Sequence, residues 1–279
     1  MDLSLNFKLF PKKVNNAFPS SLRVGNELIH NLKPLGGIFK PGITKAGRIS
    51  FRGTLNNGSK VKVYQSFNEK QINLRKEIGE QCKTMDVLFP KVLFNDKNFI
   101  VEEWIMGKTF SKLKPRIIDK FSFKVINFLE VLHFDSKFIN IAKKNGDTFC
   151  YLSDYLFMRL KPWNQWLPVE KLLEKWQESK LETYNLIESK ISHPDLSLSN
   201  IILSKDEKIY IIDNELIVSG TGCLLDRKNS FFRDKVPIPN FVPPIYQFYK
   251  LSWKLRLVGS AIDNGDFNRA ERMAKIDIN

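Results

Sequence analysis

The stretch HPDLSLSNIILSKDEKIYIIDNE, residues 193–215, decides the fold that we expect for this chain. It contains two short runs of β-branched and aromatic residues, 201–203 and 209–212, separated by a polar and charged connector. Such runs on either side of a short polar segment predict a β-hairpin. Asn200 directly precedes the first strand and Asp213 directly follows the second, so pairing of the strands would bring these two side chains together.

A third polar residue, Asp195, lies near the start of the same stretch. Phosphoryl transfer requires one carboxylate that orients the attacking hydroxyl and accepts its proton, and oxygen ligands that hold Mg²⁺ on the phosphates. Each of these residues alone would more often cap a turn. Their order and spacing together favour Asp195 as the catalytic residue and Asn200 and Asp213 as metal ligands.

The stretch reads His-x-Asp-x-x-x-x-Asn, then a hairpin, then Ile-Ile-Asp, and it resembles the catalytic and metal-binding segment of the protein-kinase-like superfamily. It is most similar to the aminoglycoside phosphotransferase and choline kinase branch, because no Arg precedes Asp195 and because Glu215 follows two residues after Asp213. That branch usually has Gly where this chain has Pro194. The resemblance implies that Glu215 assists the metal ligands and that His193 supports the catalytic loop.

The same resemblance implies an α+β, bilobal protein-kinase-like fold. A small antiparallel-sheet lobe and a larger, mainly helical lobe would bind ATP and Mg²⁺ between them. We expect residues 1–30 to be an N-terminal extension, 31–106 the small nucleotide-binding lobe with a hinge at about 102–107, and 107–279 the catalytic and substrate lobe. A chain of 279 residues with 43% hydrophobic residues is large enough for this architecture.

A strand-rich region fits the small lobe. Residues 48–55 alternate between apolar and polar, 56–58 read Asn-Asn-Gly, and 60–64 alternate again, which predicts two strands joined by a tight turn. The resemblance assigns Lys62 to the nucleotide phosphates, beneath a glycine-containing hairpin. The glycines upstream do not form a standard phosphate-binding spacing; they are Gly36, Gly37, Gly42 and Gly47.

Residues 69–85 show partial helical periodicity and predict a helix. The resemblance implies that a Glu of this helix pairs with Lys62 and holds it in place. Glu77 is the first candidate for that role, and Glu80 is the alternative. A strand Lys and a helix Glu are ordinarily solvated, so this pairing depends on the resemblance and not on local sequence.

The segment 99–107, FIVEEWIMG, predicts a buried strand that leaves into a turn. It resembles the hinge between the two lobes, where backbone groups around Glu102, Glu103 and Trp104 would bind adenine. Local evidence alone is equally consistent with an ordinary strand end.

Downstream of the hinge the pattern becomes helical. Apolar residues recur at intervals of three and four between 117 and 132, which predicts a core-facing helix. The resemblance places substrate-selecting helices at 151–190 and gives Asp226 a supporting role near the catalytic loop. The aromatics of that region would either stack on a substrate sugar or amine or, more commonly, pack in the core; they include Trp163, Trp166 and Trp176.

Composition limits the remaining possibilities. The three cysteines are widely separated and odd in number, which favours neither a disulfide framework nor a zinc cluster, and we expect a cytoplasmic protein. No apolar run approaches the length of a membrane-spanning helix. The net charge of +14 is distributed along the chain, so we expect no dedicated nucleic-acid site. Oligomeric state is open.

The sequence therefore predicts an ATP-dependent phosphotransferase that uses Mg²⁺ and acts on a hydroxyl of a small molecule or glycan. Aminoglycoside, choline, sugar and homoserine-like acceptors are all compatible with the motifs. A protein kinase, a kinase-like pseudoenzyme or scaffold, and a nucleic-acid-binding module are the alternatives. A protein kinase would need a longer activation segment than the interval from Asp213 to Asp226 provides.

Overall fold

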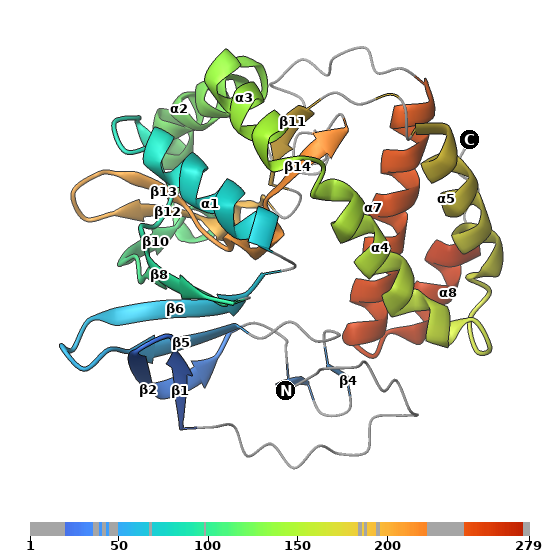
Figure 1. The fold of residues 1–279 in the computed structure, drawn as a ribbon, viewed down its shortest axis with the longest axis horizontal. Coiled ribbons are helices and arrows are strands. Elements are labelled where there is room, and N and C mark those ends of the chain that lie inside the picture. The colour runs from blue at the N-terminus through green and yellow to red at the C-terminus, as the bar shows by residue number, and fades with distance from the viewer. Residues whose placement is uncertain are drawn as a thin grey trace.

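The structure is a computed structural model in which a strand-rich small lobe is followed by a larger helical lobe (Figure 1). It describes residues 20–35, 39–40, 43–44, 50–66, 69–97, 99–183, 186, 189–193, 196–221 and 243–275. In Figure 1 the small-lobe sheet lies at the lower left, and helices α4, α5, α7 and α8 stand together at the right.

One antiparallel sheet forms the small lobe, with the strand order β1-β2-β5-β6-β9-β8. Its strands are β1 (Ser21–Val24), β2 (Glu27–Pro34), β5 (Ser50–Thr54), β6 (Lys60–Gln65), β8 (Val92–Asp96) and β9 (Phe99–Glu103). The two strands predicted on either side of the Asn-Asn-Gly turn are confirmed as β5 and β6. A hydrogen bond from Gly58 N to Leu55 O closes that turn.

Strand β6 is covered on both faces. Val61 and Val63 are buried in the hydrophobic core of the sheet, and Lys62 and Tyr64 lie on the opposite face because side chains alternate along a strand. Tyr64 packs there against Ile72 of helix α1 (Glu69–Gln81). The side chain of Lys62 is therefore held in a largely buried position on the face of the sheet that also carries Tyr64.

The sheet begins earlier in the sequence than predicted. Residues 21–30 form β1 and part of β2, which pair as a hairpin around Gly25. Gly25 has a φ of +58°, a left-handed conformation that glycine adopts without strain. Val24 and Ile29 are buried in the small-lobe core, so this hairpin belongs to the lobe. The predicted extension is wrong for residues 21–30, and residues 1–19 lie outside the described part of the chain.

Two short strands, β3 (Phe39–Lys40) and β4 (Ile43–Thr44), pair with each other between β2 and β5. The glycines that we considered for a phosphate-binding hairpin lie outside the described residues; they are Gly36, Gly37, Gly42 and Gly47.

The predicted helix at 69–85 is confirmed as α1, which ends at Gln81. Ile72, Leu74 and Ile78 are its buried apolar residues. One side of α1 packs near β8, and another packs against helix α3 and strand β14 of the large lobe. Helix α1 thus touches both lobes.

The large lobe holds a second sheet in the order β10-β12-β13-β7. Its strands are β7 (Val87–Leu88), β10 (Gly107–Thr109), β12 (Ile201–Ser204) and β13 (Ile209–Ile211). A separate antiparallel pair joins β11 (Ser189–Ser192) to β14 (Val218–Thr221). The helices that pack beside these strands are η2 (Phe110–Lys112), α2 (Pro115–Phe134) and α3 (Ser136–Asn145). Helix α2 confirms the apolar periodicity predicted for residues 117–132.

A helical bundle with its own core completes the lobe (Figure 1). Its helices are α4 (Phe149–Leu160), η3 (Lys161–Trp163), α5 (Glu170–Thr183), α7 (Pro243–Asp263) and α8 (Phe267–Lys275). Trp176 is buried, stacks on Phe157 and donates to Ser252 Oγ at 3.0 Å, so it is a core residue. Trp166 is exposed.

Among the described helices, none has both the length and the apolar character needed to cross a membrane.

Candidate active site

The predicted hairpin in the stretch 193–215 is confirmed. Ile201 pairs with Ile211, and Leu203 pairs with Ile209. In the connector, Ser204 Oγ donates to Asp206 Oδ1 at 2.6 Å, which lowers the pKa of that carboxyl group. The hairpin is therefore a regular antiparallel unit whose turn points away from its polar open end.

Asn200 and Asp213 meet at the open end of this hairpin. Asn200 ends the short helix η4 (Leu198–Asn200), and its backbone carbonyl accepts a hydrogen bond of 2.8 Å from Ile212 N. Asp213 follows Ile212 directly, so the two polar residues occupy neighbouring positions, as predicted. Asn and Asp side chains offer the oxygen ligands that Mg²⁺ accepts, and Mg²⁺ usually takes one or two protein ligands together with substrate phosphates.

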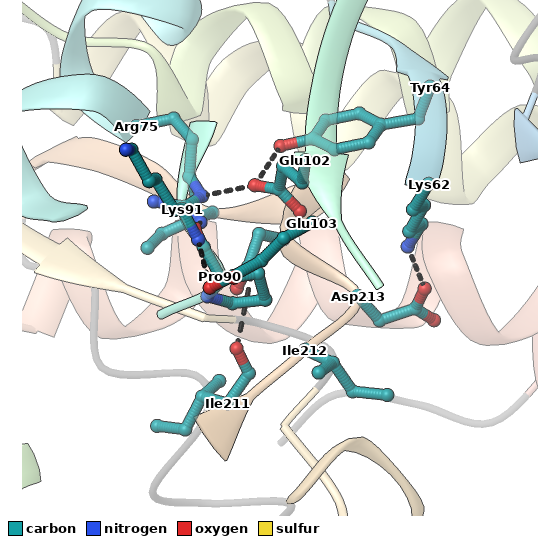
Figure 2. A network of polar contacts seen from close by, with 12 residues as sticks. Lys62, Tyr64, Arg75, Pro90, Lys91, Glu102, Glu103, Ile211, Ile212 and Asp213 are labelled. Atoms are coloured by element: carbon teal, nitrogen blue, oxygen red, sulfur yellow. Dashed lines mark hydrogen bonds and ion pairs between the residues drawn. The ribbon is translucent and has the colours of Figure 1, made fainter. Parts of the chain in front are cut away.

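The backbone of Asp213 is unusual. Its φ of 65° and ψ of 43° are left-handed, a conformation that is uncommon outside glycine but tolerated by Asp. Such conformations cost free energy and tend to persist at functional sites. The carboxylate forms an ion pair with the amino group of Lys62 (Figure 2). The Lys62 side chain is 9% exposed and that of Asp213 is 40% exposed, so the pair bridges the lobes at a partly accessible point.

His193 contacts the backbone of the residue that precedes Asp213. Its ring is buried, and Nε2 donates to Ile212 O over 3.1 Å, which requires the ring proton on Nε2. Ile212 thereby uses its N–H for Asn200 and its carbonyl for His193. The hydrogen bond from His193 therefore holds the backbone directly before Asp213.

The side chains of the predicted site residues Asp195, Asp226 and Glu215, and of Pro194 beside Asp195, are not described. Asp195, Pro194 and Asp226 lie outside the described residues, and only the backbone of Glu215 is described, within η5 (Asn214–Leu216). Their roles stay predictions.

The predicted pairing of Glu77 with Lys62 is wrong. The Glu77 carboxylate lies 3.1 Å from Lys144 Nζ and 3.5 Å from Asn145 Nδ2, both on or at the end of helix α3. The alternative, Glu80, is exposed and pairs with Lys83. The reason is the rotation of α1 about its axis, which turns both glutamates away from β6.

The residues of α1 that do face the sheet and the hairpin were missed by sequence reasoning. Arg75 is fully buried, and its Nε lies 2.6 Å from Glu102 Oε1 on β9 (Figure 2). Gln71, one turn earlier, donates from Nε2 to Ile217 O at 2.9 Å. Both residues fall on the helix face that also carries Ile78. The sequence signal that could have identified them is the presence of polar residues within this buried apolar stripe.

In the segment that we expected to be the hinge, two backbone N–H groups are already used in strand pairing. Glu103 N donates to Lys91 O at 3.0 Å, and Trp104 N donates to Lys60 O at 3.1 Å, so strand pairing uses both donors. The Glu102 side chain turns into the buried contact with α1. Within the described part of the chain, no backbone hydrogen bond is found for the N–H of Ile105, the next residue.

Comparison with known proteins places the fold. No model of a known protein family matches the sequence, and no curated protein matches it. Solved structures match almost the whole chain. The structure of LicA in complex with AMP is 15% identical with a TM-score of 0.52, over 90% of this chain and 93% of that chain. The gentamicin complex of APH(2")-IIa is 19% identical with a TM-score of 0.48, over 89% and 92%.

A macrolide 2'-phosphotransferase type I is 13% identical with a TM-score of 0.47, over 89% of this chain and 94% of that chain. At identities this low a match shows the fold alone, and among these three structures only that of LicA has a TM-score above 0.5. The predicted fold class is thereby confirmed: the chain shares the fold of the LicA structure, an α+β fold with an antiparallel small-lobe sheet and a mainly helical large lobe.

Proposed function

We propose that this protein is an ATP-dependent phosphotransferase that moves the γ-phosphate of ATP to a hydroxyl of a small molecule or glycan. The observation that carries the proposal is the convergence of Lys62, Asn200 and Asp213 between the lobes. The ammonium group of Lys62 pairs with the carboxylate of Asp213, and the backbone of Asn200 is hydrogen-bonded to the residue directly before Asp213. Phosphoryl transfer depends mainly on such positioning and charge stabilisation.

In this proposal the small lobe holds the nucleotide. Lys62 contacts the phosphates, and the hinge at Glu103 and Trp104 lies along the adenine. The N–H of Ile105 donates a hydrogen bond to the edge of the adenine ring. Glu102 belongs to the same segment, but its carboxylate serves the contact with α1.

The large lobe would supply the chemistry. Asp195 orients the acceptor hydroxyl and takes its proton, and Asn200 and Asp213 hold Mg²⁺ with Glu215 assisting. Bound Mg²⁺ neutralises charge that develops on the phosphates. His193 holds the backbone before Asp213, and Asp226 supports the loop.

The acceptor class stays broad. Aminoglycoside, choline, sugar, glycan and homoserine-like hydroxyls are all compatible with the proposed site. We propose a cytoplasmic location for this enzyme.

The test is ADP release from ATP with Mg²⁺ across a panel of aminoglycosides, choline, sugars, glycans and homoserine. We expect turnover with at least one acceptor and a loss of about 100-fold or more in Asp195→Ala and in Asp213→Ala. Asp119→Ala, an exposed carboxylate on α2, is the matched control and should keep turnover.

Two results would redirect the proposal. Binding of ATP with Mg²⁺ but no consumption with any acceptor indicates a kinase-like scaffold. Transfer of labelled phosphate to protein substrates alone indicates a protein kinase. Failure to bind nucleotide at all contradicts the proposal itself.

A further inference from the structure

A buried carboxylate lies directly behind the proposed phosphate-binding Lys. Glu102 of β9 pairs in register with Lys62 of β6, so both side chains lie on the same face of the small-lobe sheet. Glu102 is 1% exposed. An ionised carboxylate buried this deeply is costly unless other groups compensate its charge.

Two side chains compensate Glu102. Arg75 of α1 places Nε 2.6 Å from Glu102 Oε1, and the hydroxyl of Tyr64 on β6 donates to the same oxygen at 2.9 Å (Figure 2). Arg75 also donates from Nη2 to Pro90 O at 2.5 Å. One helix and two strands are thus joined at a single carboxylate.

This network ends beside the proposed catalytic groups. The ring of Tyr64 lies 5.3 Å from Lys62 Nζ, and Lys62 in turn pairs with Asp213. On its other side, α1 reaches the segment after Asp213 through Gln71 and Ile217 O. Helix α1 is therefore tied to the hinge strand by Arg75 and to the large lobe by Gln71.

A contribution to the free energy of unfolding does not by itself explain the buried ion pair of Arg75 and Glu102. Replacing a buried ion pair by apolar residues of similar size is often neutral or stabilising. In addition, Arg75 Nη1 makes no hydrogen bond to any described residue, which adds an uncompensated buried donor. Since this ion pair contributes little net stability, the position in which it holds helix α1 against strand β9 is the better explanation for it.

We propose that Arg75 and Glu102 are positioning residues that set the distance between α1 and the hinge strand and, through Tyr64, hold Lys62 where the nucleotide phosphates bind. This inference rests on the proposed function. It assigns to a helix cation and a strand carboxylate the task that we had expected of a helix Glu paired with Lys62.

The decisive experiment compares Arg75→Met, Glu102→Gln and the double variant. Each single variant leaves one uncompensated buried group, so we expect a clear fall in Tm. The double variant removes both charges, and we expect its Tm to return to within about 3 °C of the wild type. Its kcat/KM for ATP should nevertheless stay roughly tenfold or more below the wild type, because Lys62 is misplaced. The KM for the acceptor should not change. A double variant with wild-type Tm and wild-type kcat/KM for ATP overturns the inference.

Tyr64→Phe tests the same point without disturbing the ion pair, in case the double variant does not fold. It keeps the ring beside Lys62 and removes only the hydrogen bond to Glu102, and we expect the KM for ATP to rise about threefold. Tyr151→Phe, on an exposed part of α4, is the matched control. An unchanged KM in Tyr64→Phe contradicts the inference.

A readout without ATP separates this inference from the proposed function. Hydrogen exchange of the apoprotein should be about tenfold faster in α1 and β9 of the double variant than in the wild type. In the Tyr64→Phe variant, hydrogen exchange in β9 should be faster than in the wild type. Equal exchange in the variants and the wild type overturns the inference even if the wild type proves inactive, whereas an inactive wild type with the expected exchange contradicts only the proposed function.

Discussion

The amino group of Lys62 forms an ion pair with the carboxylate of Asp213, and this contact joins strand β6 of the small lobe to the end of β13 in the large lobe. The two residues are 151 positions apart in the sequence. Lys62 reaches Asp213 from a nearly buried strand position, while Asp213 is held in a left-handed backbone conformation. In the proposed reaction both groups face the phosphates, so the contact marks where the nucleotide would bind.

Removal of the Lys62 ammonium should therefore impair catalysis more than folding. We expect Lys62→Met to lower ATP turnover by about 100-fold or more, because a preorganised charge at the phosphates is lost. The measurement is ADP release at saturating acceptor, with circular dichroism to confirm the fold. Lys33→Met, an exposed lysine on β2, should keep turnover near that of the wild type. Equal turnover in both variants would refute the role of Lys62.

His193 should matter through the backbone that it holds. His193→Ala removes the hydrogen bond to Ile212 O and leaves a cavity, and we expect the free energy of unfolding to fall by about 2–4 kcal/mol. His193→Gln keeps a side-chain N–H donor and should lose less stability and less turnover. Urea unfolding and ADP release measure the two effects. A Gln variant as impaired as the Ala variant would show that this hydrogen bond is not what His193 contributes.

Gly107 is required by close packing between two strands. It pairs with Ser204 on β12, and a Cβ at this position would overlap the backbone carbonyl of Leu203. We expect Gly107→Ala to lower the free energy of unfolding by about 1–3 kcal/mol, because β10 must move away from the strand that follows Asn200. Met106→Ala, at the neighbouring exposed position, should change stability by less than about 0.5 kcal/mol. Urea unfolding distinguishes the two variants.

The buried thiol of Cys82 should weaken the fold at alkaline pH. Burial raises its pKa from 9.0 to about 12, with Arg75 opposing that shift. The thiol in the unfolded chain loses its proton near pH 9, whereas the thiol in the folded chain keeps it, so stability is fully present below pH 9 and falls as pH rises toward 12. Between pH 8 and pH 10 this contributes a loss of about 1.4 kcal/mol. Urea unfolding of Cys82→Ala should show a fall with pH that is smaller by this amount, and identical pH slopes would contradict the assignment.

Local sequence predicted much of the fold and part of the site. The period-two pattern of 60–64 placed Lys62 on one face of a strand, and the hairpin in 193–215 placed Asn200 beside Asp213. These outcomes depend on alternation along a strand and on strand pairing across a short connector, and both are set by neighbouring residues. The β1–β2 hairpin was missed because its strands carry a weak pattern, although Val24 and Ile29 are buried.

The sequence by itself determined which residue types meet at the open end of the hairpin and which strand carries the facing Lys62. Only the tertiary structure decided which residue of α1 meets the sheet. Packing of Ile72 and Ile78 fixed the rotation of the helix, which turned Glu77 toward α3 and Arg75 toward Glu102. The contribution of a helix residue to a site depends on that rotation, and the rotation is set by the shapes of the surfaces that pack against the helix and not by the charge of any single residue.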